Sequence, residues 1–188
     1  MLKKILFLGL AFVASVSWAS AQIMPSPARA EGKGPYEKLI IRGVTLIDGT
    51  GAPPLGPVDI VVEKNRITQI QAVGYPGVPI NENRRPKADD KTKVMDLTGH
   101  YLMPGLIDMH GHIGGSGQGT PAEYVFKLWM AHGITTVRDP SAGNGLTWVL
   151  EHKKKSAANE ITAPRLLAYT SFGQGAKGPI TNAEQAKA

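Results

Sequence analysis

The chain has 188 residues, of which 42% are hydrophobic and 19% are charged, and this is the composition of a globular protein. It contains no cysteine, which excludes a disulfide scaffold, a thiolate metal site and a cysteine nucleophile. The formal net charge is +6, but the cations are scattered apart from a run of three lysines at residues 153–155. Because there is no basic stripe and no known nucleic-acid module, we expect no nucleic-acid partner.

The first 21 residues have the pattern of a secretory signal peptide. Two lysines precede an apolar run over residues 5–16, and the Ala-Ser-Ala sequence at residues 19–21 is typical of a cleavage site. As a helix the run would span about 18 Å, too short for a hydrocarbon core of about 30 Å. We therefore expect cleavage near Ala21, a secreted or periplasmic location, and no stable membrane insertion after cleavage. Residues 22–35 are rich in Pro, Ala and Gly and are expected to be a flexible lead-in.

Residues 36–100 have the pattern of a small β unit. Short β-branched or alternating runs predict strands at residues 39–41, 44–47, 58–62, 67–71 and 94–97. Residues 63–66 are expected to form a tight hairpin in which Asn65 takes the left-handed conformation. The proline-broken segment 74–93 is expected to be a long loop.

From residue 101 the pattern changes to alternating strands and helices. A helix is expected with Thr120 as its N-cap, Pro121 as its first residue and Gly133 at its end, followed by a strand at residues 134–137. A second helix to about residue 159 and a strand at residues 164–169 follow. This alternation predicts right-handed βαβ units and a parallel sheet.

The end of the chain has the pattern of an interrupted helix. A helix is expected to start near Asn182, which leaves it about two turns before the last residue. We interpret this as truncation within a βα unit, with a natural frayed tail as the alternative.

Two histidines two residues apart are the strongest candidate metal ligands. On a strand, His110 and His112 would point to the same face with Cα atoms about 6–7 Å apart, so both imidazoles can reach one divalent cation. Asp108 has the same parity and is expected to accept an imidazole N–H. The alternative is a chance pair, since the chain has five histidines.

The other candidate residues are weaker. Asp139 ends the strand after the first helix, where it would contact substrate or brace a loop, and we favour the bracing role. Arg138 has the opposite parity and is expected to pair outward. His132 is expected at the C-terminal end of a helix, and His152 on a solvated, lysine-flanked helix face. Ser116 and Ser141 lie near glycines, but no G-x-S-x-G elbow follows a strand, so a serine hydrolase is not expected.

The order of four motifs is similar to that of the metal-dependent amidohydrolase superfamily. They are Asp48-Gly49-Thr50, the segment 104–108, the pair His110-x-His112 and the segment 133–139. The closer likeness is to secreted members related to imidazolonepropionase and to Xaa-Pro dipeptidase-like hydrolases. This resemblance implies an α/β fold, in which a small β-sandwich lies beside a TIM (β/α)8 barrel. It also implies that His110 and His112 bind a divalent metal, usually zinc.

The same resemblance implies that the barrel is incomplete. A barrel needs about 250 residues, so residues 101–188 suffice for its first three βα units, with residues 36–100 as the sandwich portion. The family's further ligands, a carboxylated lysine or glutamate, two histidines and an aspartate, come from later strands, and we do not match Lys177 to any of them.

The resemblance implies a hydrolase that acts on carbon–nitrogen bonds through a metal-activated water. Its small-molecule substrate would be an amide, a cyclic amide or a dipeptide-like compound, and the chain would be the N-terminal part of the enzyme. The alternative is a catalytically inactive truncated product that at most binds metal weakly or pairs with another chain. The sequence leaves the oligomeric state open.

Overall fold

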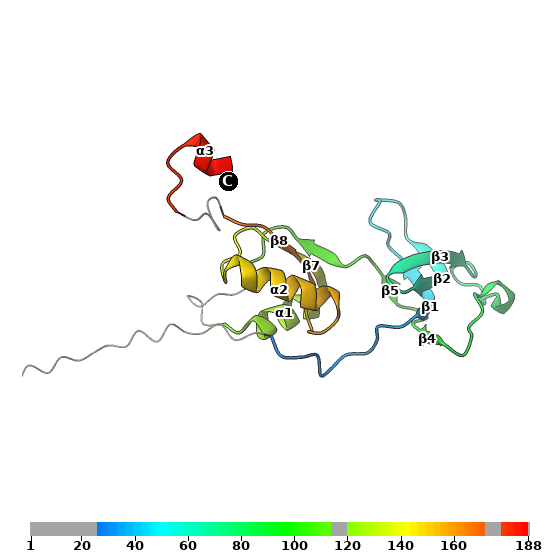
Figure 1. The fold of residues 1–188 in the computed structure, drawn as a ribbon. Coiled ribbons are helices and arrows are strands. Elements are labelled where there is room, and N and C mark those ends of the chain that lie inside the picture. Colours follow the sequence, from blue (N-terminus) through cyan, green and yellow to red (C-terminus); the bar gives the residue numbers. More distant parts are fainter. Residues whose placement is uncertain (1–25, 114–119, 172–177, 188) are drawn as a thin grey trace, which may run out of the picture.

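The computed structural model describes residues 26–113, 120–171 and 178–187. The predicted signal peptide, most of the predicted lead-in and Lys177 lie outside these residues. The described chain forms two units, one built on a mixed β-sheet and the other on a parallel sheet with helices (Figure 1). Within the described ranges, no helix is both long and apolar enough to cross a membrane.

The first unit is a mixed sheet organised around its longest central strand. Its strands are β1 (Lys38–Leu46), β2 (Leu55–Glu63), β3 (Arg66–Ala72), β4 (Thr92–Asp96) and β5 (Tyr101–Leu102). The order is β3-β2-β1-β4, with β5 also paired to β1; β2 runs antiparallel to both β1 and β3, while β4 and β5 run parallel to β1. Val44, Val58 and Ile60 form its buried core. The described residues of this unit form one sheet, so the second layer of the predicted sandwich is not among them.

Three local predictions in this unit need correction. The tight hairpin is present, with Glu63 paired to Arg66, but Lys64 rather than Asn65 has the positive φ angle of 55°. The predicted long loop contains a short 3-10 helix, η1 (Glu82–Arg84), where the Asn81 side chain accepts the Asn83 N–H. Residues 101–102 join the first sheet through β1, since the Pro-Gly sequence that follows them interrupts the strand.

The second unit is a parallel sheet in the order β6-β7-β8. Its elements are β6 (Leu106–Asp108), α1 (Ala122–Ala131), β7 (Ile134–Asp139), α2 (Leu146–Ala157) and β8 (Arg165–Ala168), followed by a short α3 (Ala183–Lys187). The predicted alternation and parallel pairing are therefore confirmed for the described elements. The helix α1 begins one residue later than predicted, with Pro121 at the N-cap position, and Glu123 pairs with Lys127 one turn further on.

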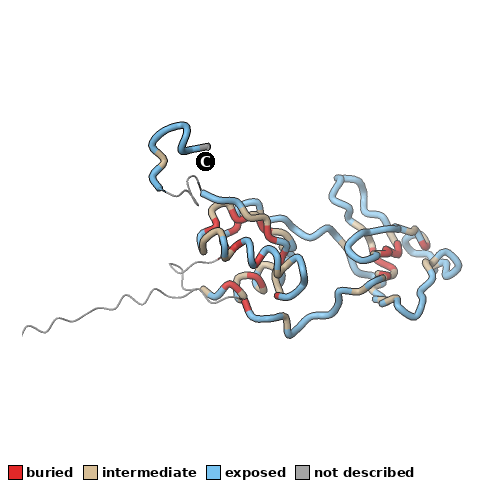
Figure 2. Tube along the Cα trace, in the orientation of Figure 1, coloured by how far each residue is buried: buried red, intermediate tan, exposed pale blue. Residues whose placement is uncertain are grey.

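The helices α1 and α2 cover the same face of the parallel sheet. Phe126 of α1 and Val149 of α2 pack in one buried cluster with Val137 and Leu166 of the strands. Figure 2 shows this buried layer between the helices and the sheet. On the opposite face Ile107 is 59% exposed. The sheet is therefore covered on one side only by the described residues.

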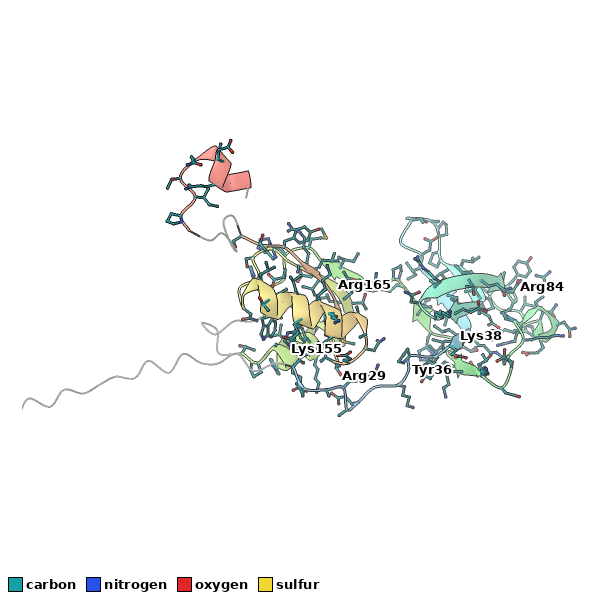
Figure 3. The ribbon with its side chains drawn as sticks, in the orientation of Figure 1. Arg29, Tyr36, Lys38, Arg84, Lys155 and Arg165 are labelled. Carbon is teal, nitrogen blue, oxygen red and sulfur yellow. The ribbon has the colours of Figure 1, made fainter. Side chains whose placement is uncertain are left out.

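Two segments of chain connect the units. Residues 26–37 run from the helices to β1, and residues 103–105 join β5 to β6 (Figure 1). Arg29 lies at the helix end of the first segment and Tyr36 at its sheet end (Figure 3).

Candidate metal centre

The histidine pair lies just beyond the end of an edge strand. The strand β6 ends at Asp108, and His110 and His112 follow it in a turn and the next extended residues. The strand geometry predicted for the pair is therefore wrong. The rings nevertheless lie close together in an edge-to-face arrangement, with centroids 5.2 Å apart and planes at 78°. The turn, rather than strand parity, brings the two imidazoles together, and both side chains are exposed.

Asp108 forms the turn instead of orienting a ring. Its Oδ1 accepts the backbone N–H of His110 at 2.9 Å. The sequence prediction, in which this carboxylate accepts an imidazole N–H, is not what the structure shows. A carboxylate that accepts an N–H two residues on is a common turn device, and it competes with the next ladder hydrogen bond of the strand.

Gly111 allows the pair to lie close over the neighbouring strand. Its N–H donates to the Arg138 carbonyl at 3.0 Å. A Cβ atom at this position would come within 2.7 Å of Val137 Cγ1 and 3.0 Å of Trp129 Cζ2. A residue without a side chain is therefore required between the two histidines, and the close contact holds the turn against β7.

Asp139 braces the loop beside His112. The side chain is buried, and its Oδ1 accepts the backbone N–H groups of Ser141 at 3.1 Å and Ala142 at 3.2 Å. The same oxygen lies 3.9 Å from His112 Nδ1. Of the two roles considered for Asp139, the structure shows the bracing one. The carboxylate also lies near one member of the histidine pair.

Ser141 is a neighbour of the pair that the sequence did not indicate. Its Oγ lies 3.3 Å from His112 Nδ1. The signal available in the sequence is the spacing Asp139-Pro140-Ser141, because an aspartate that accepts the N–H two residues on turns the chain. That turn returns the serine toward the loop after β6.

Arg138 places a cation near the turn without facing the imidazoles. Its guanidinium donates to the Met109 carbonyl at 3.3 Å and lies 4.5 Å from the centroid of the Tyr169 ring. These contacts differ from the outward pairing predicted for Arg138, because they tie β7 to the turn that carries His110.

The donor set suits a divalent transition-metal ion in type but not in number. Imidazole nitrogens are preferred ligands of zinc and similar ions, which take three or four protein ligands. The described part of the chain holds no group of three or more His, Asp or Glu side chains placed to bind one ion. His110 and His112 therefore provide two ligands, and Asp139 with Ser141 stands beside one of them.

Two other histidines lie away from this site. His132 is the C-cap of α1, with its Nδ1 2.8 Å from the Leu128 carbonyl, as predicted. His152 is completely buried, so the prediction of a solvated side chain is wrong. The lysines beside it point elsewhere because the helix turns His152 toward Phe126 of α1.

Comparison with known proteins places the chain in a family. No protein-family model matches it. An adenine deaminase 2 from Rhizobium etli is 35% identical over 132 residues, which make up 66% of this chain and 19% of that protein. Two solved structures share its arrangement: molinate hydrolase, with a TM-score of 0.57 and 23% identity, and a putative prolidase from Bifidobacterium longum, with a TM-score of 0.56 and 25% identity.

The chain belongs to the amidohydrolase superfamily. The match covers 73% of this chain and 31% of the molinate hydrolase chain, and 78% and 34% for the prolidase. The chain thus spans a minor part of the length of these amidohydrolases, and the likeness extends over both sheets. The relatives are hydrolases, and enzymes of the superfamily use divalent metals.

Proposed function

We infer that this chain supplies the first two ligands of a metal-dependent hydrolase that acts on carbon–nitrogen bonds of small molecules. The observation that carries the proposal is the close pair of imidazoles just after β6, with ring centroids 5.2 Å apart. This is the carboxyl end of a parallel strand, where barrel enzymes build their active sites. A deaminase and a prolidase among the relatives support the carbon–nitrogen bond as the reacting group.

The residues present have distinct parts in this proposal. His110 and His112 would hold the ion, for which zinc is our first choice because imidazole suits it. The ion, when bound, lowers the pKa of a water molecule and polarises the substrate. Asp108 holds the turn that brings the two rings together. Ser141 would orient His112 through its Nδ1, with the Asp139 carboxylate 3.9 Å from the same nitrogen, and Nε2 of that ring would remain for the ion.

The proposal includes further ligands outside the described residues. Two imidazoles leave a divalent ion half satisfied, so the 188-residue chain alone is expected to bind zinc weakly and to lack turnover. In the complete enzyme the described sheets would be part of a β-sandwich and the first βα units of a TIM barrel. We also retain the secreted or periplasmic location as part of the proposal.

Zinc binding by the chain tests the role of the pair. We expect a competition titration against a chromophoric chelator to show about one weak zinc equivalent that dialysis removes, and His110→Ala with His112→Ala to abolish it. His100→Ala is the matched control, since His100 is exposed in a turn of the other unit and should leave zinc binding unchanged. Equal zinc affinity in the double variant and the parent chain would remove the basis of the proposal.

A hydrolysis assay tests the rest of the proposal. It uses the protein expressed from the complete reading frame that contains these 188 codons. Hydrolysis of amide, cyclic amide and dipeptide substrates should disappear in the double histidine variant and persist in His100→Ala. A complete product whose hydrolysis does not depend on the pair would contradict the assignment. If the full-length protein binds zinc through the pair but hydrolyses none of these substrates, the result would support the alternative of an inactive protein that only binds metal.

A further inference from the structure

A short segment before the first sheet is held to the helices by polar contacts. We call residues 26–31 the strap. The Ser26 N–H donates to His152 Nε2 at 3.1 Å, and the Arg29 N–H donates to the Glu160 carbonyl at 2.7 Å. The Glu31 carboxylate pairs with Lys127 of α1. The strap therefore bridges α1 and the residues after α2.

Little apolar contact supports these bonds. The small side chains Ala28 and Ala30 are exposed, and a cavity of about 300 Å³ lies between the strap and α1, lined by Ser26, Glu31, Glu123 and Lys127 among others. Ser26 is buried, yet its Oγ has no hydrogen-bond partner among the described residues. A segment with few buried contacts opens at low free-energy cost, so single hydrogen bonds decide whether it stays docked.

The contacts of His152 define its protonation state. Its Nδ1 lies 2.9 Å from the Trp148 carbonyl and must donate the proton in that bond, because a carbonyl only accepts. Its Nε2 accepts from Ser26 and therefore carries no proton. The ring is neutral in the docked state, stacked on Trp148 with centroids 3.6 Å apart and fully buried.

We propose that His152 is a pH-sensitive latch for the strap, which docks when the imidazole is neutral and is released when Nε2 takes up a proton. A proton on Nε2 turns the acceptor into a second donor facing the Ser26 N–H, and it places a charge between Trp148 and Phe126. Breaking this contact leaves Arg29 and Glu31 as the remaining attachments of the strap.

The charged groups around the latch do not compensate for this charge. On α2 itself Lys155 disfavours a charged imidazole and Glu151 favours it, but these two pair with each other at 2.6 Å. From α1 and the strap, Lys127 faces the same region and is paired with Glu123 and Glu31. Burial is the largest influence and lowers the pKa of His152 below its ordinary value of 6.5, with Lys155 acting in the same direction.

The direction of the pH effect follows from linkage. Because the docked state has the lower histidine pKa, docking is at full strength above the pKa that His152 has in the released state and weakens as the pH falls from there toward the lowered pKa. Over that interval the ratio of docked to released strap falls up to about tenfold per pH unit. Release would loosen one of the two connections between the units and leave residues 103–105 as the other (Figure 1).

Amide hydrogen exchange measures the latch in the complete chain. Exchange is followed by mass spectrometry at pH 7.5 and pH 5.0, corrected for intrinsic rates, in peptides covering the strap and β1. We expect protection of the strap to fall about tenfold or more at the lower pH, while protection of β1 is unchanged. Equal protection of the strap at both pH values would overturn the proposal.

Two variants separate the latch from a general acid effect. His152→Gln retains a side-chain oxygen that accepts from the Ser26 N–H at either pH, so strap protection should become independent of pH. Ser26→Pro removes the donor without changing the helices, and should leave the strap unprotected at both pH values, which keeps the test valid if His152→Gln does not fold. His100→Gln, at an exposed turn, should retain the parent response. An unchanged pH response in either of the first two variants would also refute the latch.

Discussion

The two faces of the parallel sheet differ in what covers them. On one face Val137 and Leu166 are buried beneath α1 and α2. On the other face Ile107, which pairs with Thr136, is 59% exposed. Parallel sheets are normally covered on both faces. The described residues thus complete one side of the sheet, and the open side is the one that the rest of a barrel would cover.

The candidate site lies at the rim between these faces. Asp139 has the parity of Val137 and is buried, whereas the imidazoles of His110 and His112 extend beyond the strand end into solvent. Asp139, on the helix-covered face, therefore holds the loop beside His112, and Arg138, with the opposite parity, contacts the turn that carries His110. Substitutions on the covered face, at the rim and on the open face should have successively smaller effects on stability.

The largest effect is expected from Phe126→Ala on the covered face. Phe126 is completely buried and contacts Trp129 and His152, so its removal should cost about 3–5 kcal/mol of the free energy of unfolding. Urea denaturation measures the loss, and the control is Tyr124→Ala on the same helix, where the side chain is 60% exposed. Similar losses in the two variants would mean that α1 does not pack as described.

A smaller effect is expected from Asp139→Ala at the rim. The change leaves the partly buried N–H of Ser141 and the buried N–H of Ala142 without their acceptor and should cost about 1–3 kcal/mol. Asp139→Asn retains an acceptor oxygen and should recover most of this loss in the same denaturation experiment. If the asparagine variant is as unstable as the alanine variant, the negative charge beside His112 matters more than the hydrogen bonds.

The smallest effect is expected from Ile107→Ser on the open face. Because this side chain is mostly exposed, the free energy of unfolding should change by no more than about 0.5 kcal/mol. Val137→Ser, on the covered face of the adjacent strand, is the matched control and should be clearly destabilising. A large loss in Ile107→Ser would show that another part of the protein covers this face in solution.

Much of the fold could be predicted because its signals are local. The alternating and β-branched runs that became β1, β2, β3 and β7 reflect the two-residue period of strands, and the apolar face of α1 reflects the period of a helix. Parallel pairing of β6, β7 and β8 followed from the intervening helices. The site was found in part for the same reason, since a spacing of two residues already brings His110 close to His112.

The errors have non-local or competing causes. His152 was expected in solvent because three lysines follow it, yet its burial depends on Phe126 of another helix and on Ser26, 126 positions earlier. Strand parity assigned Asp108 to an imidazole, but the strand ends there because that carboxylate accepts a backbone N–H instead. Ser141 approached His112 only through the turn that Asp139 makes after β7.

The sequence by itself determined the order of strands and helices and the identity of the histidine pair, because periodicity and short spacings act over a few residues. Only the tertiary structure decided which side chains surround that pair and which histidine is buried. Those outcomes depend on contacts between residues far apart in the chain, such as Asp139 with His112 and Ser26 with His152. No local pattern records such contacts, since they form only when the helices and strands pack together.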